Sequence, residues 1–137
     1  MPTPMPKLKP VRILIVDDHH ELRRAIRNLL ECQRGFVVCG EAKDGVEAIH
    51  KSDELKPDVV VLNIVMPVMN GFEAARKIRE VSPQSRVVIL SSYTDTQLLK
   101  EAHDVGAVCY VPKSDAEREL IEAVNTAAEG RVLGTLL

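Results

Sequence analysis

The sequence predicts an α/β fold in which a five-stranded parallel sheet is doubly wound with five helices, a (βα)5 arrangement. Two observations predict it. Short runs rich in valine, isoleucine and leucine recur along the chain, and such runs suit strands buried on both faces. Each run precedes a segment whose apolar residues recur every three or four positions, as in an amphipathic helix. Alternating strands and helices with short, right-handed connections form a doubly wound sheet.

The first part of the chain supplies two strands and two helices. In order, these are a strand over residues 11–16 (VRILIV), a helix over 19–31, a strand over 36–42, and a helix that opens at Asp44 or Gly45 and closes at Pro57. The apolar face of the first helix consists of Leu22, Ala25, Ile26, Leu29 and Leu30. Gly35 is the expected stop after that helix, because glycine readily adopts the left-handed backbone found there.

The fold is centred on residues 57–71, PDVVVLNIVMPVMNG. The unbroken apolar run 59–62 suits the middle strand of a parallel sheet, and it ends at Asn63. The remaining elements are expected as a helix over 72–81, a strand over 86–90, a helix that Asp95 caps and Gly106 stops, a strand over 107–111, and a last helix that ends at Gly130.

We expect one folded domain over residues 11–130, because 137 residues suffice for a single core. The first ten residues contain four prolines, which predicts a flexible leader over residues 1–10. Residues 131–137 are expected to form a C-terminal tail.

Composition excludes several classes of function. A net charge of −2 with both signs interspersed gives no basic footprint for nucleic acid. No apolar run is long enough for a membrane span, and the start lacks the apolar core of a signal peptide. Three scattered cysteines without a CxxC pair favour a reducing cytoplasm, where they act as small buried hydrophobes rather than redox groups.

Polar residues stand where the predicted strands end. Asp17 and Asp18 follow the first strand, Asn63 the third, Ser91 the fourth, and Lys113 lies just beyond the fifth. These ends share one edge of a parallel sheet, so the side chains should converge. Paired carboxylates suit Mg²⁺, and a lysine with a hydroxyl suits phosphoryl oxygens. The pattern therefore favours a magnesium-dependent phosphoryl-transfer site.

The chain resembles the receiver domain of two-component response regulators. The resemblance covers about residues 11–130 and is carried, in order, by ILIVDDHHELRRAIRNLL, CGEAKDGVEAI, PDVVVLNIVMPVMNG, VVILSSY and AVCYVPKS. The DDH opening and the CGEAKDG stretch resemble the LuxR/FixJ (NarL-like) class, whose members carry a helix-turn-helix output domain. The resemblance implies a flavodoxin-like sheet with strand order 2-1-3-4-5, and it makes residues 131–137 the start of a linker to an output domain absent from this chain.

The resemblance also implies a metal site and a phospho-acceptor. Asp17 and Asp18 match the acidic pair that organises Mg²⁺, and the backbone carbonyl of Val65 matches a further metal ligand. Position 63 matches the aspartate that receives phosphate from a histidine kinase, and it also borders the metal. Here it is Asn63.

Three more residues match the family pattern. Ser91 matches the hydroxyl that moves toward the phosphoryl group, and Tyr110 matches the aromatic switch residue that moves with it. Lys113 matches the lysine that pairs with the phosphoryl group or the acidic site. The resemblance thus implies a signalling module rather than an enzyme.

The amide of Asn63 changes the expected chemistry. Its nitrogen lone pair is delocalised, so it forms no acyl phosphate, and the loss of one negative charge predicts weaker Mg²⁺ binding. We expect the metal-free protein to be at least as stable as its Asn63→Asp counterpart. Two origins stay open: an engineered or recent block of an otherwise intact site, or a natural pseudo-receiver that acts as a phosphorylation-independent interaction module.

The same residues admit other interpretations. Asp17 and Asp18 also suit a helix N-cap pair, and His19 and His20 are expected on the exposed first turn of the helix. A haloacid-dehalogenase-like phosphatase needs an Asp-x-Asp pattern, which the run Asp17–Asp18–His19 lacks. A dinucleotide-binding domain needs G-x-G-x-x-G after the first strand, which is missing.

The resemblance implies the partners. A sensor histidine kinase or phosphotransfer protein should dock on the first helix. A second copy of the chain should pair through the face of the fourth helix, fifth strand and fifth helix, or through the first and fifth helices. DNA would be bound only through an output domain beyond this chain, and no membrane is involved. Without an acceptor, the chain should stay mainly in the inactive population.

Overall fold

The computed structural model describes residues 9–93 and 95–129. Its five strands form one parallel sheet in the order β2-β1-β3-β4-β5, which confirms the predicted fold class and strand order. The strands are β1 (Val11–Val16), β2 (Phe36–Ala42), β3 (Val59–Leu62), β4 (Arg86–Ser91) and β5 (Cys109–Pro112). The helices are α1 (His20–Glu31), α2 (Gly45–Leu55), α3 (Gly71–Val81), α4 (Thr96–Asp104) and α5 (Ala116–Ala128), with a 3₁₀ turn, η1 (Lys113–Asp115), before α5.

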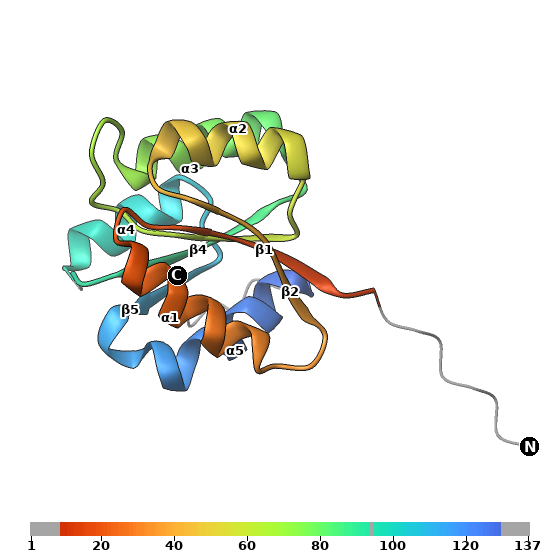
Figure 1. Ribbon diagram of the computed structural model, residues 1–137. Coiled ribbons are helices and arrows are strands. Elements are labelled where there is room, and N and C mark those ends of the chain that lie inside the picture. The colour runs from red at the N-terminus through yellow and green to blue at the C-terminus, as the bar shows by residue number, and fades with distance from the viewer. Residues whose placement is uncertain (1–8, 94, 130–137) are drawn as a thin grey trace, which may run out of the picture.

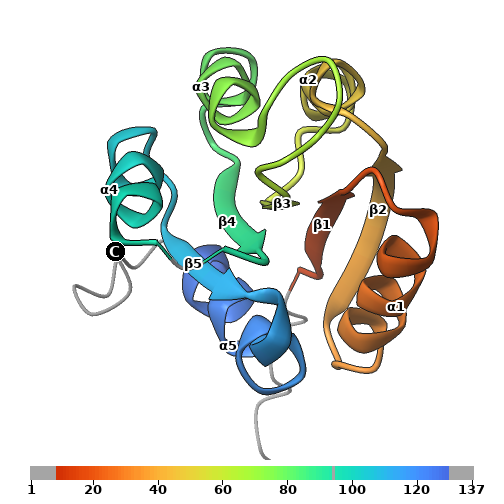
Figure 2. The same ribbon diagram turned by 90° about the vertical axis from the view of Figure 1, so that its left-hand side faces the viewer.

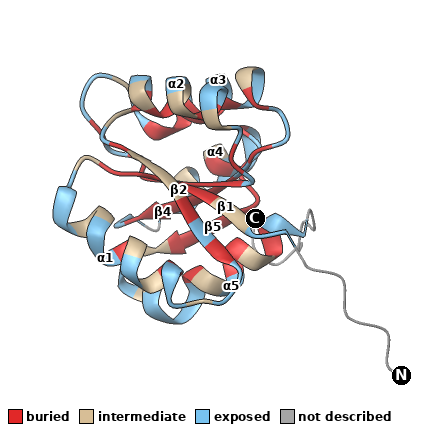
Figure 3. Ribbon diagram, turned by 45° about the vertical axis from the view of Figure 1, so that its right-hand side comes forward, coloured by how far each residue is buried: buried red, intermediate tan, exposed pale blue. Residues whose placement is uncertain are grey.

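The sheet lies between two layers of helices. Helices α2, α3 and α4 cover one face, and α1 and α5 cover the other (Figures 1 and 2). Alternate residues of β3 enter the two cores: Val60 and Leu62 pack toward α3, and Val59 and Val61 pack toward α1 and α5. This two-sided burial explains why the central strand is apolar at every position. Figure 3 shows the strands buried at the centre and the outer helix faces exposed.

Helix caps explain where several helices begin. The side chain of Asp44 accepts the backbone N–H of Glu47, which fixes the start of α2 at the next residue. Asn70 caps α3 in the same way, so this helix begins at Gly71, one residue earlier than predicted. Asp95 caps α4, as predicted.

Some details differ from the sequence prediction. His19 is the N-cap of α1 and no side chain makes a capping hydrogen bond there, so the alternative in which Asp17 and Asp18 cap this helix is wrong. Ala25, expected on the apolar face of the first helix, is exposed. Strand β5 begins at Cys109, two residues later than expected.

The chain ends were also assigned from the sequence. The expected stop at Gly130, the tail 131–137 and the first eight residues of the leader lie outside the described residues. Among the helices of the described part, none combines the length and apolarity needed to cross a membrane.

The three thiols are unpaired and lie in different environments. Cys109 is buried, Cys39 is half-buried and Cys32 is exposed, so the prediction of a buried hydrophobe is right for Cys109 and wrong for Cys32. Burial raises the pKa of Cys109 to about 11, which keeps this thiol protonated at neutral pH.

Candidate functional site

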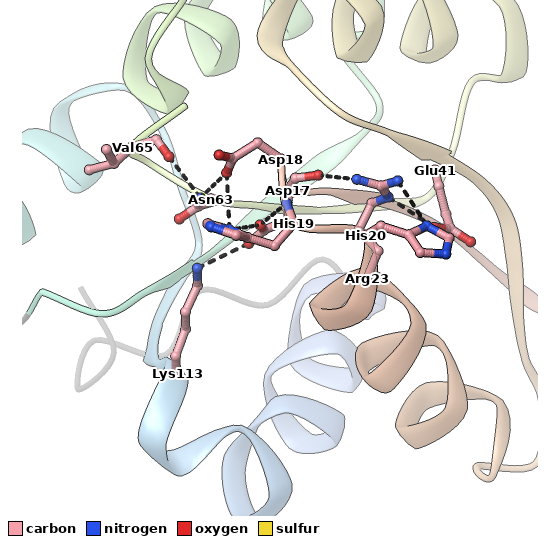
Figure 4. A network of polar contacts seen from close by, with 9 residues as sticks. All are labelled: Asp17, Asp18, His19, His20, Arg23, Glu41, Asn63, Val65 and Lys113. Atoms are coloured by element: carbon pink, nitrogen blue, oxygen red, sulfur yellow. Dashed lines mark hydrogen bonds and ion pairs between the residues drawn. The ribbon is translucent and has the colours of Figure 1, made fainter. Parts of the chain in front are cut away.

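The register of the sheet brings the two central strand ends side by side. Val16 of β1 is paired with Leu62 of β3, so Asp17 and Asn63 follow neighbouring strands at the same level. The backbone N–H of Asn63 donates to the carbonyl of Val16 at 3.0 Å, which extends the ladder by one step. The polar side chains after β1, β3 and β5 meet here (Figure 4).

Asp17 is a buried carboxylate held by a lysine. It is 1% exposed, and its Oδ2 lies 3.0 Å from Nζ of Lys113, whose side chain is 18% exposed. A buried charge needs such a partner, because desolvation otherwise costs several kcal/mol. Lys113 is therefore tied to the acidic pair rather than being a solvated turn residue.

Asn63 lies between the two other groups expected around a metal. Its Nδ2 donates to the backbone carbonyl of Val65 at 2.9 Å and to Oδ1 of Asp18 at 3.4 Å. The residue is 5% exposed. The amide hydrogens thus point at the carbonyl and at the carboxylate that the family resemblance assigns to Mg²⁺ (Figure 4).

The main chain at this position is fixed by helix α3. The N–H of Gly71 donates to the carbonyl of Ile64 at 2.7 Å. A Cβ at Gly71 would lie 2.2 Å from the carbonyl oxygen of Asn63 and 2.8 Å from Cα of Ile64, so only glycine fits. The start of α3 therefore packs directly on the backbone of the candidate acceptor.

His19 joins the group, although the sequence placed it only on an exposed turn. Its backbone N–H donates to Oδ1 of Asp17 at 2.9 Å. Its ring Nδ1 lies 3.0 Å from Oδ1 of Asp17 and 3.4 Å from Oδ1 of Asp18. The ring is exposed, as predicted, but it faces both carboxylates.

Ser91 and Tyr110 meet on a different residue. The Oγ of Ser91, 1% exposed, accepts the backbone N–H of Tyr93 at 3.1 Å. The hydroxyl of Tyr110, a buried residue, donates to the carbonyl of Tyr93. Within residues 9–93 and 95–129, neither side chain hydrogen-bonds to Asn63, Asp17 or Lys113. Both instead fix the chain just after β4.

A second charged group lies beside the acidic pair, and the sequence analysis missed it. Glu41 of β2 accepts from Nε of Arg23 at 3.0 Å and from Nη1 of Arg27 at 2.6 Å. Burial alone would raise the pKa of Glu41, but the hydrogen bonds from Arg27 and Arg23 outweigh it and hold this pKa below its ordinary value. Arg23 also donates through Nη1 to the carbonyl of Asp17 at 2.7 Å.

The donor set fits a divalent cation. One ligand atom each from Asp17, Asp18 and His19 lie within 4.8 Å of one another. Two carboxylates and a nearby carbonyl are the oxygen ligands that Mg²⁺ prefers, and receiver domains bind Mg²⁺ in an acidic pocket of this kind. The amide of Asn63 does not fit this donor set as it stands, because its N–H groups donate to two of these oxygens, Oδ1 of Asp18 and the carbonyl of Val65.

An α/β sheet of this order, with such an acidic pocket at its carboxyl edge, defines the receiver class of signalling domains. Residues 13–125 match the family described as the response regulator receiver domain, and the chain belongs to this family.

The relatives are regulators of the LuxR type. The chain is 36% identical over 115 residues to the response regulator protein VraR of Staphylococcus saprophyticus, covering 84% of this chain and 55% of that protein. It is 34% identical over 122 residues to the transcriptional regulatory protein YdfI of Bacillus subtilis, covering 89% of this chain and 57% of that protein. The chain thus spans a little over half the length of these relatives.

A solved structure shows the same likeness. The LuxR-family two-component response regulator from Aurantimonas sp. is 35% identical, with a TM-score of 0.86, over 90% of this chain and 89% of that chain. The chain is therefore a receiver domain homologous to those of LuxR-family response regulators.

Proposed function

We propose that this chain is the receiver domain of a LuxR-type transcriptional regulator that takes no phosphoryl group, because Asn63 stands at the acceptor position. One observation carries the proposal. Asn63 follows the central strand and hydrogen-bonds to Asp18 and Val65, while Lys113 pairs with Asp17. These contacts join the acidic pair, the lysine and the carbonyl of Val65 around position 63, where an amide stands in place of a nucleophile.

The chemistry follows from the side chain at position 63. Phosphoryl transfer to a receiver requires an anionic carboxylate oxygen that attacks phosphorus and forms an acyl phosphate. The amide of Asn63 is neutral and has no such oxygen, so the transfer stops before the first bond forms. Lys113 stays with Asp17 instead of pairing with a phosphoryl oxygen.

Mg²⁺, when bound to a receiver, neutralises phosphoryl oxygens. In this chain Asp17, Asp18 and the carbonyl of Val65 would hold it. To offer its oxygen to a cation, the Asn63 amide must turn over and give up its hydrogen bonds to Val65 and Asp18. Weakened Mg²⁺ binding follows from this cost and from the missing negative charge.

The proposed switch residues stay in their resting contacts. Without a phosphoryl group, nothing attracts the Ser91 hydroxyl away from the N–H of Tyr93, and Tyr110 keeps its hydrogen bond to the same residue. The face of α4, β5 and α5 is then available to a partner in one conformation. A kinase or phosphotransfer helix would still dock on α1, since docking does not require the acceptor.

A natural pseudo-receiver is the second candidate. The observation that favours it is the amide itself, which satisfies Asp18 and Val65 without metal. In that case partner binding alone regulates the domain. In either case the chain is a signalling module without catalytic turnover, and any binding to DNA belongs to a part of the protein beyond this chain.

Labelling with acetyl phosphate tests the proposal. The chain as it stands, incubated with labelled acetyl phosphate and Mg²⁺, should incorporate no label, and Asn63→Asp should incorporate it. Asn70→Asp is the matched control, because it makes the same chemical change at an exposed helix cap where aspartate serves equally well.

The outcomes separate the candidates. Label on the unaltered chain would overturn the proposal. Label on Asn63→Asp alone supports a blocked but otherwise competent receiver. No label on any of the three supports the pseudo-receiver.

A further inference from the structure

The guanidinium group of Arg23 in α1 links strand β2 to the turn after β1 that carries the acidic pair. Its Nε donates to Glu41 of β2, and its Nη1 donates to the backbone carbonyl of Asp17 after β1. The side chain is 14% exposed. An arginine fork so enclosed, with donors directed at two fixed acceptors, holds both in one geometry.

The carbonyl that Arg23 holds is the one that orients Asp18. It belongs to the peptide unit between Asp17 and Asp18, which is planar, so fixing its oxygen fixes the direction in which Asp18 leaves the strand. The N–H of Asp17 donates to Ala42 of β2 at 3.1 Å. Asp17 is thus held on both sides of its backbone, by the sheet at its N–H and by Arg23 at its carbonyl.

Arg27 offers a built-in comparison. It lies one turn later on α1 and donates to the same carboxylate of Glu41. Within the described residues it makes no hydrogen bond to Asp17, and it pairs instead with Glu31 at 3.2 Å. Arg23 and Arg27 therefore both pair with Glu41. Arg23 adds the bond to the Asp17 carbonyl and a contact of 3.4 Å between its Nη2 and Nδ1 of the exposed His20, whereas Arg27 adds the pair with Glu31.

We infer that Arg23, supported by Glu41, is a positioning residue for the candidate metal pocket, setting the backbone from which the Asp17 and Asp18 carboxylates project. The inference rests on the proposed function in that it assigns a role toward the same pocket. The direction of the change in Mg²⁺ affinity when Arg23 is replaced distinguishes a positioning role from an effect of its charge. A cation near a metal site repels the metal, so loss of the Arg23 charge alone would tighten Mg²⁺ binding, whereas loss of positioning weakens it.

The first test measures Mg²⁺ binding in the Asn63→Asp background, where the acceptor carboxylate is restored. Isothermal titration should show that Arg23→Gln and Arg23→Lys each weaken binding by about tenfold, the usual effect of removing a group that orients a ligand. In Arg23→Lys the positive charge is kept, but an ammonium group cannot donate to Glu41 and to the Asp17 carbonyl at the same time with the geometry of the guanidinium fork. Arg27→Gln should leave the affinity within about twofold, below the effect of losing an orienting group.

The second test uses the chain as it is and needs no metal. The Asn63 side-chain amide donates to Asp18, so its NMR resonances report where that carboxylate lies. They should shift in Arg23→Gln and stay in place in Arg27→Gln. Urea unfolding of both variants checks that each stays folded, which we expect because Glu41 keeps one arginine in either case.

Two results would overturn the inference. One is an equal change of Mg²⁺ affinity and of the amide resonances in the Arg23 and Arg27 variants. The other is tighter Mg²⁺ binding in Arg23→Gln, which would mean that only the charge of Arg23 matters. Neither readout uses a phosphoryl donor, so a failure of Asn63→Asp to accept label leaves this test intact.

Discussion

Two charged groups lie at the carboxyl edge of the sheet, and they differ in how their charges are matched. In the Glu41 group, one carboxylate accepts from two guanidinium groups, Arg23 and Arg27. In the Asp17–Asp18 group, Lys113 pairs with Asp17, whereas Asp18 accepts from the neutral amide of Asn63, the residue at the proposed acceptor position. In the first group, the charge of the single carboxylate is fully matched by the two guanidinium groups. The second retains unmatched negative charge, and this is what makes it receptive to a cation.

The largest change to this comparison is expected from a carboxylate at position 63. In Asn63→Asp the new carboxylate would face Oδ1 of Asp18, now 3.4 Å from the amide. Two charges about 4 Å apart repel by about 4 kcal/mol at an effective dielectric of about 20. Without metal, we expect urea unfolding to show a large loss of stability, and Mg²⁺ to restore it.

The Asn63→Asp protein should also bind Mg²⁺ more tightly than the unaltered chain in calorimetric titration. Asn70→Asp controls for the chemical change. Equal Mg²⁺ affinities in the two acceptor forms would defeat the charge argument.

Removing the lysine should have the next largest effect. Lys113→Ala leaves the carboxylate of Asp17 buried without its main cation, and breaking such a pair costs about 3 kcal/mol. The control is Asp53→Asn, which removes the charge of a well-exposed carboxylate from its pair with Lys56, so its loss should cost only about 0–1 kcal/mol. Urea unfolding of both variants measures the difference, and similar losses would show that the Asp17 pair is not special.

Changes in the Glu41 group should cause a smaller loss of stability. Glu41→Gln removes the charge from two hydrogen bonds that are partly exposed, and we expect a loss of roughly 1–2 kcal/mol. Glu31→Gln, which touches only the exposed Arg27 pair, should cost about 0.3–0.5 kcal/mol. If the two variants unfold alike, the Glu41 group is not a structural unit.

The smallest expected effect is the pH dependence that Glu41 gives to the free energy of unfolding. The pKa of Glu41 in the folded chain lies below its ordinary value of 4.5, so the unfolded chain binds the proton more readily. The contribution of this residue is complete above the unfolded value and is lost as pH falls below about 4.5 through the folded value. The difference in unfolding free energy between the unaltered chain and Glu41→Gln should narrow over that range. If this difference in unfolding free energy stayed constant as the pH falls, the pH dependence would not come from the lowered pKa of Glu41.

The sequence could predict the strand ends because burial leaves a clear pattern. The apolar run 59–62 ends where the sheet ends, so the sequence alone predicts that Asn63 and Asp17 lie at one edge. The caps at Asp44 and Asp95 were likewise readable, because their chemistry is local. Helix caps depend on residues a few positions away in the sequence, and strand ends depend on the pattern of apolar residues, so both can be predicted from the sequence.

The contacts that the sequence did not predict are those between distant residues. Arg23 and Glu41 are 18 positions apart, and their contact depends on how β2 pairs with β1. The direction of the Asn63 amide depends on the carbonyl of Val65 in the following loop. His19 was assigned to the surface from its place in the helix turn, and periodicity does not say which way an exposed ring points.

Helix α3 rests on the main chain at position 63 through Gly71. The peptide there cannot move without displacing a whole helix, whereas the tip of the side chain can exchange NH₂ for oxygen with almost no change in shape. The codons for asparagine and aspartate differ by a single base. A backbone fixed in this way lets asparagine and aspartate replace each other at position 63 with the same main-chain geometry, so one base change alters the charge of the pocket and leaves its shape in place.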